Sequence, residues 1–335
     1  MDTTTEDRIE RLRRWIDVDS TSGSEAEFLE ALEEHLAGAG FTIERQPVDE
    51  RQWNLIATRG TNPPLLYSTH VDTVPPFLPS RVEGEAVYGR GACDTKGGIV
   101  AMIEAGERLL ADGLDDFGYL FVVGEEVDHV GARTATELKL RPRRIILCEP
   151  TENRVVRAQK GMVKATLRAK GVAAHSAYPE RGHSAVHDLL DALDALRRHE
   201  WPTDEILGPT TLNVGVIEGG VASNVIAADA HAEILIRTVS ATAPLVAAIE
   251  DLVGDRARVE VPAANDPVFF DPPDGVETCL AAFNTDATYL SQLGPVWLVG
   301  PGDIEVAHSV DEHVTFASLA AGVDLYEKLG REVLR

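Results

Sequence analysis

The chain has 335 residues, of which 44% are hydrophobic and 26% are charged, a balance typical of globular proteins and long enough for two domains. Its formal net charge of −24 at pH 7 argues against nucleic acid or an anionic membrane as a partner, because the long-range field repels phosphate. The three cysteines are too scattered for a disulfide framework or a cysteine zinc site. No signal-peptide core is visible at the start and no apolar run approaches about 18 residues, so we expect a cytoplasmic protein.

The first 158 residues alternate between helical and strand patterns. Amphipathic helices are predicted over residues 5–18 and 24–38, and two further helices over 96–112 and 132–138. Short apolar runs typical of buried strands lie around them: FTIERQ, WNLIATR, PLLYSTHVD, YLFVVG and RIILCEP. This alternation predicts an α/β domain with a mostly parallel sheet, whose ligands bind beyond the carboxyl ends of the strands.

The pattern changes near residue 159. Strands are predicted at KGMVKATLRAKG, TTLNVGVIEGG, AADAHAEILIRTV and ARVEVP, with helices over 183–199 and 244–253. This βαββαβ order predicts a small α+β domain with its helices on one face of an antiparallel sheet. From residue 267 the chain is expected to return to the first domain and to end in a helix over 315–334. We therefore expect a catalytic domain formed by residues 1–158 and 267–335, interrupted by an inserted domain over 159–266.

Polar residues that can bind metals follow several of the predicted strands. These are His70 and Asp72 in STHVDTVPP, Asp94 in GRGACDTKGG, Glu125 and Glu126 in GEE, Glu149 in CEPT, and His308 in AHSVDEH. Imidazole and carboxylate groups are ligands for Zn²⁺, Co²⁺ or Mn²⁺. Two histidines and at least three carboxylates suffice for two ions that share a bridging carboxylate, which is a hydrolytic arrangement. The Gly-x-Gly of GRGACDTKGG lacks the strand–turn–helix context of a dinucleotide site.

In this order, the motifs resemble the M20 family of co-catalytic metallopeptidases and deacylases, and the resemblance covers nearly the whole chain. That family includes acetylornithine deacetylase, succinyl-diaminopimelate desuccinylase, carrier-linked lysine or ornithine hydrolases, aminoacylase and glutamate carboxypeptidase. The resemblance implies two divalent metal ions, with Zn²⁺ expected first and Co²⁺ or Mn²⁺ as alternatives. The motif set is specific to the family but says little about the substrate.

By matching position, the resemblance implies five ligands: His70 and Glu149 for one ion, Glu126 and His308 for the other, and Asp94 bridging both. It also implies that Asp72 orients the His70 imidazole and that Glu125 is the general base acting on metal-activated water. In an extended segment adjacent side chains point to opposite sides, so Glu125 and Glu126 are expected to face different partners. His129 matches no ligand position, although it is close in the sequence.

The resemblance extends to the inserted domain. His175 in AHSAYP matches a histidine that typically reaches across a homodimer to stabilise the oxyanion in the partner's active site. Gly219, Gly220 and Asn224 in EGGVASNVI match a loop that contacts substrate. Arg237 matches an arginine that often binds the substrate α-carboxylate, with a structural salt bridge as the alternative. Thr285 and Asp286 in NTDATYL resemble a second substrate-facing loop, with Thr285 as the expected contact.

The function implied is metal-dependent removal of an acyl group from an N-acylated amino acid. We expect an activity like that of acetylornithine deacetylase or of a carrier-linked lysine/ornithine hydrolase, with an N-acyl amino acid or a carrier-protein-linked amino acid as substrate. The alternatives are succinyl-diaminopimelate desuccinylase and a dipeptidase or carboxypeptidase. A silent metal-binding relative is the non-enzyme alternative, and the intact set of ligands and base argues against it.

Overall fold

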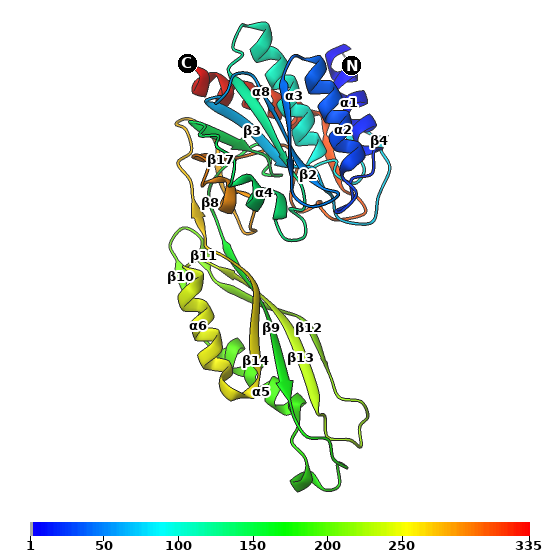
Figure 1. Ribbon diagram of the computed structural model, residues 1–335, viewed down its shortest axis with the longest axis vertical. Helices are drawn as coiled ribbons and strands as arrows, with labels where there is room; N and C mark the ends of the chain where they lie inside the picture. The colour runs from blue at the N-terminus through cyan, green and yellow to red at the C-terminus, as the bar shows by residue number, and fades with distance from the viewer. Residues whose placement is uncertain (1–2) are drawn as a thin grey trace. The chain divides into compact units, whose positions relative to one another are not determined.

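The computed structural model describes residues 3–335, and the chain divides into two units (Figure 1). Unit 1 comprises Met1–Arg157, Phe270–Cys279 and Thr285–Arg335, and unit 2 comprises Ala158–Phe269 and Leu280–Asn284. The short return of residues 280–284 to unit 2 was not anticipated from the sequence. Across the described residues, no helix is long and apolar enough to cross a membrane.

Unit 1 is built on a six-stranded sheet. Its strands lie in the order β1 (Thr42–Pro47), β2 (Trp53–Thr58), β6 (Phe117–Val122), β3 (Leu65–His70), β7 (Arg144–Leu147) and β17 (Val296–Leu298). The four strands from β6 to β17 are parallel to one another, whereas β1 and β2 add an antiparallel edge. The expected α/β fold with a mostly parallel sheet is therefore confirmed, with the difference that the sheet is mixed.

Helices cover both faces of this sheet. Strands β3 and β6 are buried at every residue, which is typical of parallel strands packed on both sides. Tyr67 and Tyr119 share one core with the helices α1 (Thr3–Ile16), α2 (Ala26–Gly38), α3 (Lys96–Ala111) and α8 (Phe316–Leu334). The shorter helices α4 (Val130–Ala135) and α7 (Ala287–Leu290) contact each other and the strands β2, β6 and β17.

A second, smaller sheet in unit 1 was not evident in the sequence. It consists of β4 (Arg81–Glu83), β5 (Ala86–Tyr88) and β18 (His313–Thr315), all paired antiparallel. Strands of three residues are too short to show a periodic pattern. This sheet positions the site, because β5 leads into the loop with Asp94 and β18 follows the loop with His308.

Unit 2 contains a four-stranded antiparallel sheet with two helices. The strand order is β12 (Thr211–Gly219), β13 (Asp229–Thr238), β9 (Gly161–Lys170) and β14 (Arg258–Asn265). Buried residues alternate along β9 and β13, and they share one core with α5 (Ala185–Arg198) and α6 (Thr242–Val253). The helices therefore lie on one face, and the order β9-α5-β12-β13-α6-β14 confirms the predicted βαββαβ domain.

The remaining elements are short. They are the 3₁₀ helices η1 (Pro179–Arg181) and η2 (Gly254–Arg256), the hairpin β10 (Thr203–Asp204) and β11 (Gly208–Pro209), and a three-stranded sheet of β15 (Val268–Phe269), β8 (Val155–Gln159) and β16 (Thr278–Ala281).

Candidate metal centre

The predicted ligands gather at the carboxyl edge of the parallel strands in unit 1. The strand ends carry His70 at the end of β3, Glu125 and Glu126 after β6, and Glu149 after β7. Parallel strands bring their carboxyl ends to one edge, and ligands of open α/β sheets bind there. Asp94 and His308 reach the same place from the loops that β5 and β18 hold together.

Asp94 is shared by two clusters of side chains. Its Oδ1 lies 3.1 Å from His70 Nε2, and its Oδ2 lies 3.2 Å from His308 Nε2. The ligand atoms of His70, Asp94 and Glu149 lie within 4.8 Å of one another, and so do those of Asp94, Glu126 and His308. The structure thus brings together the five residues expected as ligands, in the two groups expected, with one carboxylate common to both.

The environment of Glu149 also indicates a cation site, and this evidence does not depend on the sequence motif. Its side chain is buried, and its Oε1 has no hydrogen-bond partner among the described residues. Burial raises the pKa of Glu149 well above its usual value, and the carboxylates of Glu125 and Asp94 raise it further. A buried acid without a partner is costly unless a cation compensates it. Two imidazoles and three carboxylates are a ligand set suited to two divalent ions.

The two histidines are held in charged networks. Burial alone would lower the pKa of His70, but hydrogen bonds with Asp72 and Asp94 raise it well above its usual value. Hydrogen bonds with Asp94 and Glu126 raise the pKa of His308 to about 10. Burial would raise the pKa of Asp94, but the same histidines outweigh it and lower the pKa. Divalent ions must displace protons from these groups before they can bind.

Metal binding is therefore expected to release protons and to stabilise unit 1. Zn²⁺ added to chelated protein at pH 7.5 should release protons, because the pKa of His308 is raised to about 10 and the pKa values of His70 and Glu149 are also raised. Calorimetric titration in buffers of different ionisation enthalpy measures that release. Saturating ions should raise the melting temperature by roughly 10 °C, which corresponds to about 4 kcal/mol at a thousandfold excess over Kd. An unchanged melting temperature after chelation would show that the ions are not integral.

His308 should also give the chelated protein a distinct pH dependence. The folded protein holds the His308 proton up to about pH 10, whereas the unfolded chain loses it near 6.5. The stabilisation from this charge is therefore complete below pH 6.5 and is lost as the pH rises through about 10. The stability difference between wild type and His308→Gln should shrink over that window, as measured by urea unfolding. A constant difference would contradict the prediction.

Asp72 anchors the turn that carries the two adjacent glutamates. The backbone N–H groups of Glu125 and Glu126 donate to its Oδ1 and Oδ2 at 3.1 and 3.2 Å. The Ser22 hydroxyl donates to Oδ2 at 2.8 Å. His70 Nδ1 is hydrogen-bonded to the main-chain oxygen of Asp72 at 2.9 Å, and the carboxylate lies 3.5 Å away. Asp72 thus contacts the imidazole mainly through its backbone, while its carboxylate positions both glutamates.

The Glu125–Glu126 pair lies in a turn, so the expectation of an extended segment is wrong. The backbone N–H of His129 donates to the oxygen of Gly124 at 2.8 Å and closes this turn. A turn is needed here because both glutamate amides must face the single carboxylate of Asp72. The two side chains still diverge, since Glu126 belongs to the second metal cluster and Glu125 faces His129.

A third cluster beside the metal site was missed in the sequence. It contains Glu125, His129 and Asp286, whose ligand atoms lie within 4.8 Å of one another. His129 Nδ1 lies 2.9 Å from Asp286 Oδ1 and 3.5 Å from Glu125 Oε1. The available signal was the spacing of four residues between Glu125 and His129, which places side chains on one face of a helical turn. Nothing in the sequence indicated which residue would contact His129 from the other side.

A buried ion pair, which the sequence analysis also missed, holds the backbone of Asp94. Arg90 Nη1 lies 2.5 Å from Glu312 Oε2, and both side chains are fully buried. The other oxygen of Glu312 accepts hydrogen bonds from the backbone N–H groups of Asp94 and Cys93, at 3.2 and 3.3 Å. Glu312 therefore fixes the backbone of the shared ligand.

Thr285, the substrate contact expected in unit 1, is fully buried. Its hydroxyl oxygen accepts a hydrogen bond from the backbone N–H of Ala287 at 3.2 Å, which shapes the start of α7. The contact of Thr285 with substrate stays a prediction. The neighbouring Asp286 reaches the Glu125 side of the site instead.

Four further site residues were expected in the inserted domain, and all of them lie in unit 2: His175, Gly220, Asn224 and Arg237. His175 is exposed, and its Nδ1 accepts a hydrogen bond from the backbone N–H of Ala177 at 3.1 Å. The backbone N–H of Ser176 donates to the oxygen of Asn224 at 3.0 Å, so the His175 and Asn224 loops are adjacent. Arg237 alternates with the buried Ile236 and thus lies on the sheet face away from the helices. Their contacts with substrate stay predictions.

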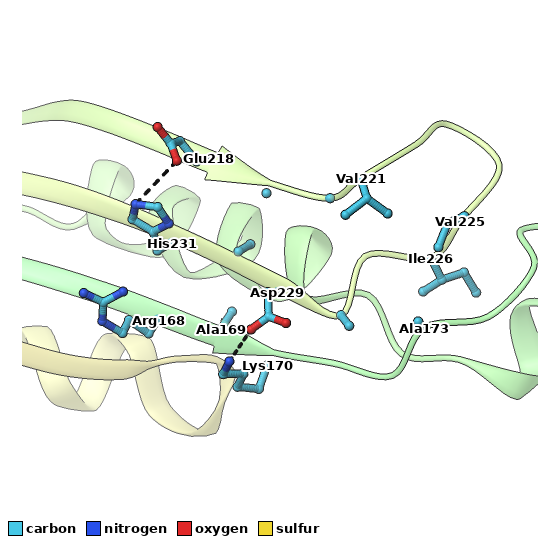
Figure 2. A pocket seen from close by; sticks show the side chains of 14 residues that line it. Arg168, Ala169, Lys170, Ala173, Glu218, Val221, Val225, Ile226, Asp229 and His231 are labelled. Carbon is cyan, nitrogen blue, oxygen red and sulfur yellow. Dashed lines mark hydrogen bonds and ion pairs between the residues drawn. The ribbon is translucent and has the colours of Figure 1, made fainter.

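Gly220 lines a pocket of about 400 Å³ at the ends of β9, β12 and β13 (Figure 2). Figure 2 shows Val221 and Ile226 at one end of this pocket and Arg168 at the other, near an ion pair between Glu218 and His231. None of the lining residues belongs to the metal clusters. All of the lining residues belong to unit 2.

Comparison with known proteins decides the family. Residues 157–260 match the peptidase dimerisation domain of M20 proteins. A peptidase M20 domain-containing protein of Schizosaccharomyces pombe is 36% identical over 326 residues, which cover 94% of this chain and 82% of that protein. The chain belongs to the M20 peptidase family. As a member of this family, the chain is a metal-dependent hydrolase of amide bonds.

Two further proteins are similar to this M20 peptidase. A probable carboxypeptidase of Aspergillus terreus is 34% identical over 364 residues, covering 95% of this chain and 84% of that protein. The structure of a dinuclear metal-binding M20 peptidase of Bacillus subtilis superposes with a TM-score of 0.73 at 16% identity, covering 99% of each chain.

Proposed function

We propose that this M20 peptidase is a carboxypeptidase that hydrolyses the last amide bond of short peptides and releases a free amino acid. The proposal rests on the arrangement around Asp94, whose two carboxylate oxygens face two separate clusters. Glu125 lies nearby and belongs to neither of these two clusters. The similarity to the probable carboxypeptidase of Aspergillus terreus supports a peptide as the substrate. This differs from the deacetylase activity first expected from the sequence, which becomes the second candidate.

The ions would be held by the residues of the two clusters, with His70 and Glu149 on one side of Asp94 and Glu126 and His308 on the other. When bound, divalent ions polarise the scissile carbonyl and lower the pKa of water at the site. Whether the cell supplies Zn²⁺, Co²⁺ or Mn²⁺ depends on metal availability as well as on the ligands.

Glu125 is proposed as the general base. Burial raises its pKa well above the usual value; His70 opposes this shift, and the charges of Asp286, Glu126 and Asp94 add to it. A carboxylate with a raised pKa is a stronger base near neutral pH. It accepts the proton of the attacking water and delivers it to the leaving amine nitrogen. Asp72 holds the backbone of this residue in place.

Unit 2 is proposed to form a homodimer and to complete the site. Its match to the peptidase dimerisation domain supports this role, as does β12, an edge strand with the exposed apolar side chains Val216 and Ile217. In the dimer, His175 would stabilise the oxyanion in the partner's site, and Gly220 and Asn224 would contact substrate. Arg237 would bind the α-carboxylate of the released residue in bidentate geometry.

The second candidate is the deacylation of an N-acyl amino acid. The chemistry is the same, because both reactions release an amino acid with a free α-carboxylate and differ only in the acyl side. Glu149 favours this candidate, since M20 members with glutamate at this position are often deacylases. N-acetylornithine, N-succinyl-diaminopimelate and carrier-protein-linked lysine or ornithine are the substrates to compare.

A substrate panel separates these activities. The Zn²⁺-loaded enzyme is assayed on N-blocked dipeptides, the same peptides with an amidated C-terminus, free dipeptides and the N-acyl amino acids above. A carboxypeptidase cleaves the N-blocked peptides and is stopped by amidation. Turnover of simple acyl groups alone would establish the deacylase instead. Cleavage of amidated peptides from their free amino end, or no cleavage at all, would overturn both candidates.

A further inference from the structure

The orientation of the Glu125 carboxylate is not fixed by its backbone alone. Asp72 fixes its backbone, but the side chain keeps three rotatable bonds. Asp286 lies beside it, with a carboxylate oxygen of each within 4.8 Å of the other, and like charges so close repel. A catalytic group must be held within about 0.5 Å of its working geometry. Some neighbouring group must therefore oppose the repulsion.

His129 occupies the place from which that repulsion can be opposed. Its backbone is fixed by the hydrogen bond to Gly124, and its φ of 58° is left-handed. Its ring lies against Tyr289 of α7, with the ring centroids 5.6 Å apart. Its side chain is 11% exposed, and its Nδ1 lies 3.5 Å from Glu125 Oε1. The imidazole is therefore held in place beside the carboxylate of Glu125.

Asp286 determines which edge of the imidazole faces Glu125. Its side chain is 1% exposed, and its Oδ1 lies 2.9 Å from His129 Nδ1. An ionised carboxylate can only accept hydrogen bonds, so this contact places the proton on Nδ1. The N–H edge then faces Glu125 Oε1 and attracts it, whereas a bare nitrogen lone pair would repel it.

We propose that His129, oriented by Asp286, is a positioning residue that holds the Glu125 carboxylate in its working orientation. The inference rests on the proposed function insofar as Glu125 is the general base there. It adds His129 and Asp286 to the residues that support catalysis, and neither is one of the five proposed ligands. His129 acts through Glu125 and does not touch the reacting atoms.

Two substitutions test the inference kinetically. His129→Leu removes the N–H group, and Asp286→Asn removes the charge that orients it without changing the shape of the side chain. Each is expected to lower kcat by about 10- to 100-fold with KM changed by less than about threefold, because the loss affects a supporting group and not substrate binding. Steady-state kinetics on a substrate of the wild-type enzyme gives both constants. An unchanged kcat in both variants, or a change confined to KM, would overturn the inference.

Two matched variants serve as controls. His129→Asn places an amide N–H near the position of Nδ1 and tolerates the left-handed backbone, so it should recover much of the activity lost in His129→Leu. Asp128→Asn changes an exposed acid in the same turn but keeps the oxygen that accepts from the backbone N–H of Val130. It should behave as wild type. If His129→Leu does not fold, Asp286→Asn still decides the kinetic outcome.

A structural readout needs no substrate and keeps the inference testable if the proposed activity fails. Crystal structures of the Zn²⁺-loaded wild type and His129→Asn should show Glu125 in one rotamer, and His129→Leu or Asp286→Asn should show more than one. A single rotamer in all of them would overturn the inference. Metal content, measured on the same samples, should stay at two ions. A third ion in wild type that is lost in the variants would show that the cluster is a metal site instead.

Discussion

Glu125→Gln is expected to lower kcat by about 10²- to 10⁴-fold while both metal ions stay bound. Glutamine keeps the shape of the side chain but cannot accept a proton. Glu125 lies outside both metal clusters, and its backbone hydrogen bond to Asp72 is unaffected by the change. Steady-state kinetics together with metal analysis by mass spectrometry measures the two quantities on one preparation.

Glu126→Gln is the matched control for this prediction, because the two glutamates are adjacent and share the Asp72 anchor. It should weaken the binding of one ion, since Glu126 contacts His308 in the second cluster. The opposite pattern, in which Glu125→Gln loses an ion and Glu126→Gln keeps both, would mean that the two roles are exchanged. Activity that survives in Glu125→Gln would show that another group is the base.

Asp94→Asn is expected to weaken the binding of both ions and to lower activity by at least about 10³-fold. The estimate follows from the several kcal/mol that metal ions contribute to the transition state. Each oxygen of Asp94 faces a different cluster, so one substitution affects both. Metal analysis and kinetics at a fixed, limiting Zn²⁺ concentration check the prediction.

Variants of residues that belong to only one cluster, or to none, serve as controls for Asp94→Asn. Glu149→Gln should affect one ion only, because Glu149 belongs to one cluster. Asp311→Asn replaces an exposed acid in the loop after His308 and should retain both ions and full activity. If Asp94→Asn binds two ions as tightly as Asp311→Asn does, Asp94 is not the shared ligand.

The sheet of unit 1 and the ligand edge were predictable because their signals are local. The run FGYLFV is apolar at most positions and LLYSTH begins with three apolar or aromatic residues, patterns typical of strands covered on both faces. The polar residues that follow each run mark the strand ends. Once the strands are taken as parallel, those ends must share an edge, whereas the pairing of His70 with Glu149 followed from the family resemblance.

The supporting contacts were not predictable because they join residues far apart in the sequence. His129 and Asp286 are 157 positions apart, and Asp94 and Glu312 are 218 apart. Each of these side chains is ordinary where it stands in the chain, and only the folded arrangement makes it a partner. The turn at Glu125 was missed for the same reason, since its shape is set by Asp72, 53 positions earlier.

The carboxylate of Asp94 is common to both clusters, so two ions held there would be thermodynamically linked. A cation held by one cluster would neutralise part of the charge of Asp94 that the other cluster would otherwise use, and it would compete with protons for the histidine of its own cluster. Binding at one site must therefore change the affinity at the other, and by an equal factor in each direction. Exchanging Zn²⁺ for Co²⁺ in one cluster should shift the metal affinity of the other cluster, although the ligands of that second cluster are unchanged.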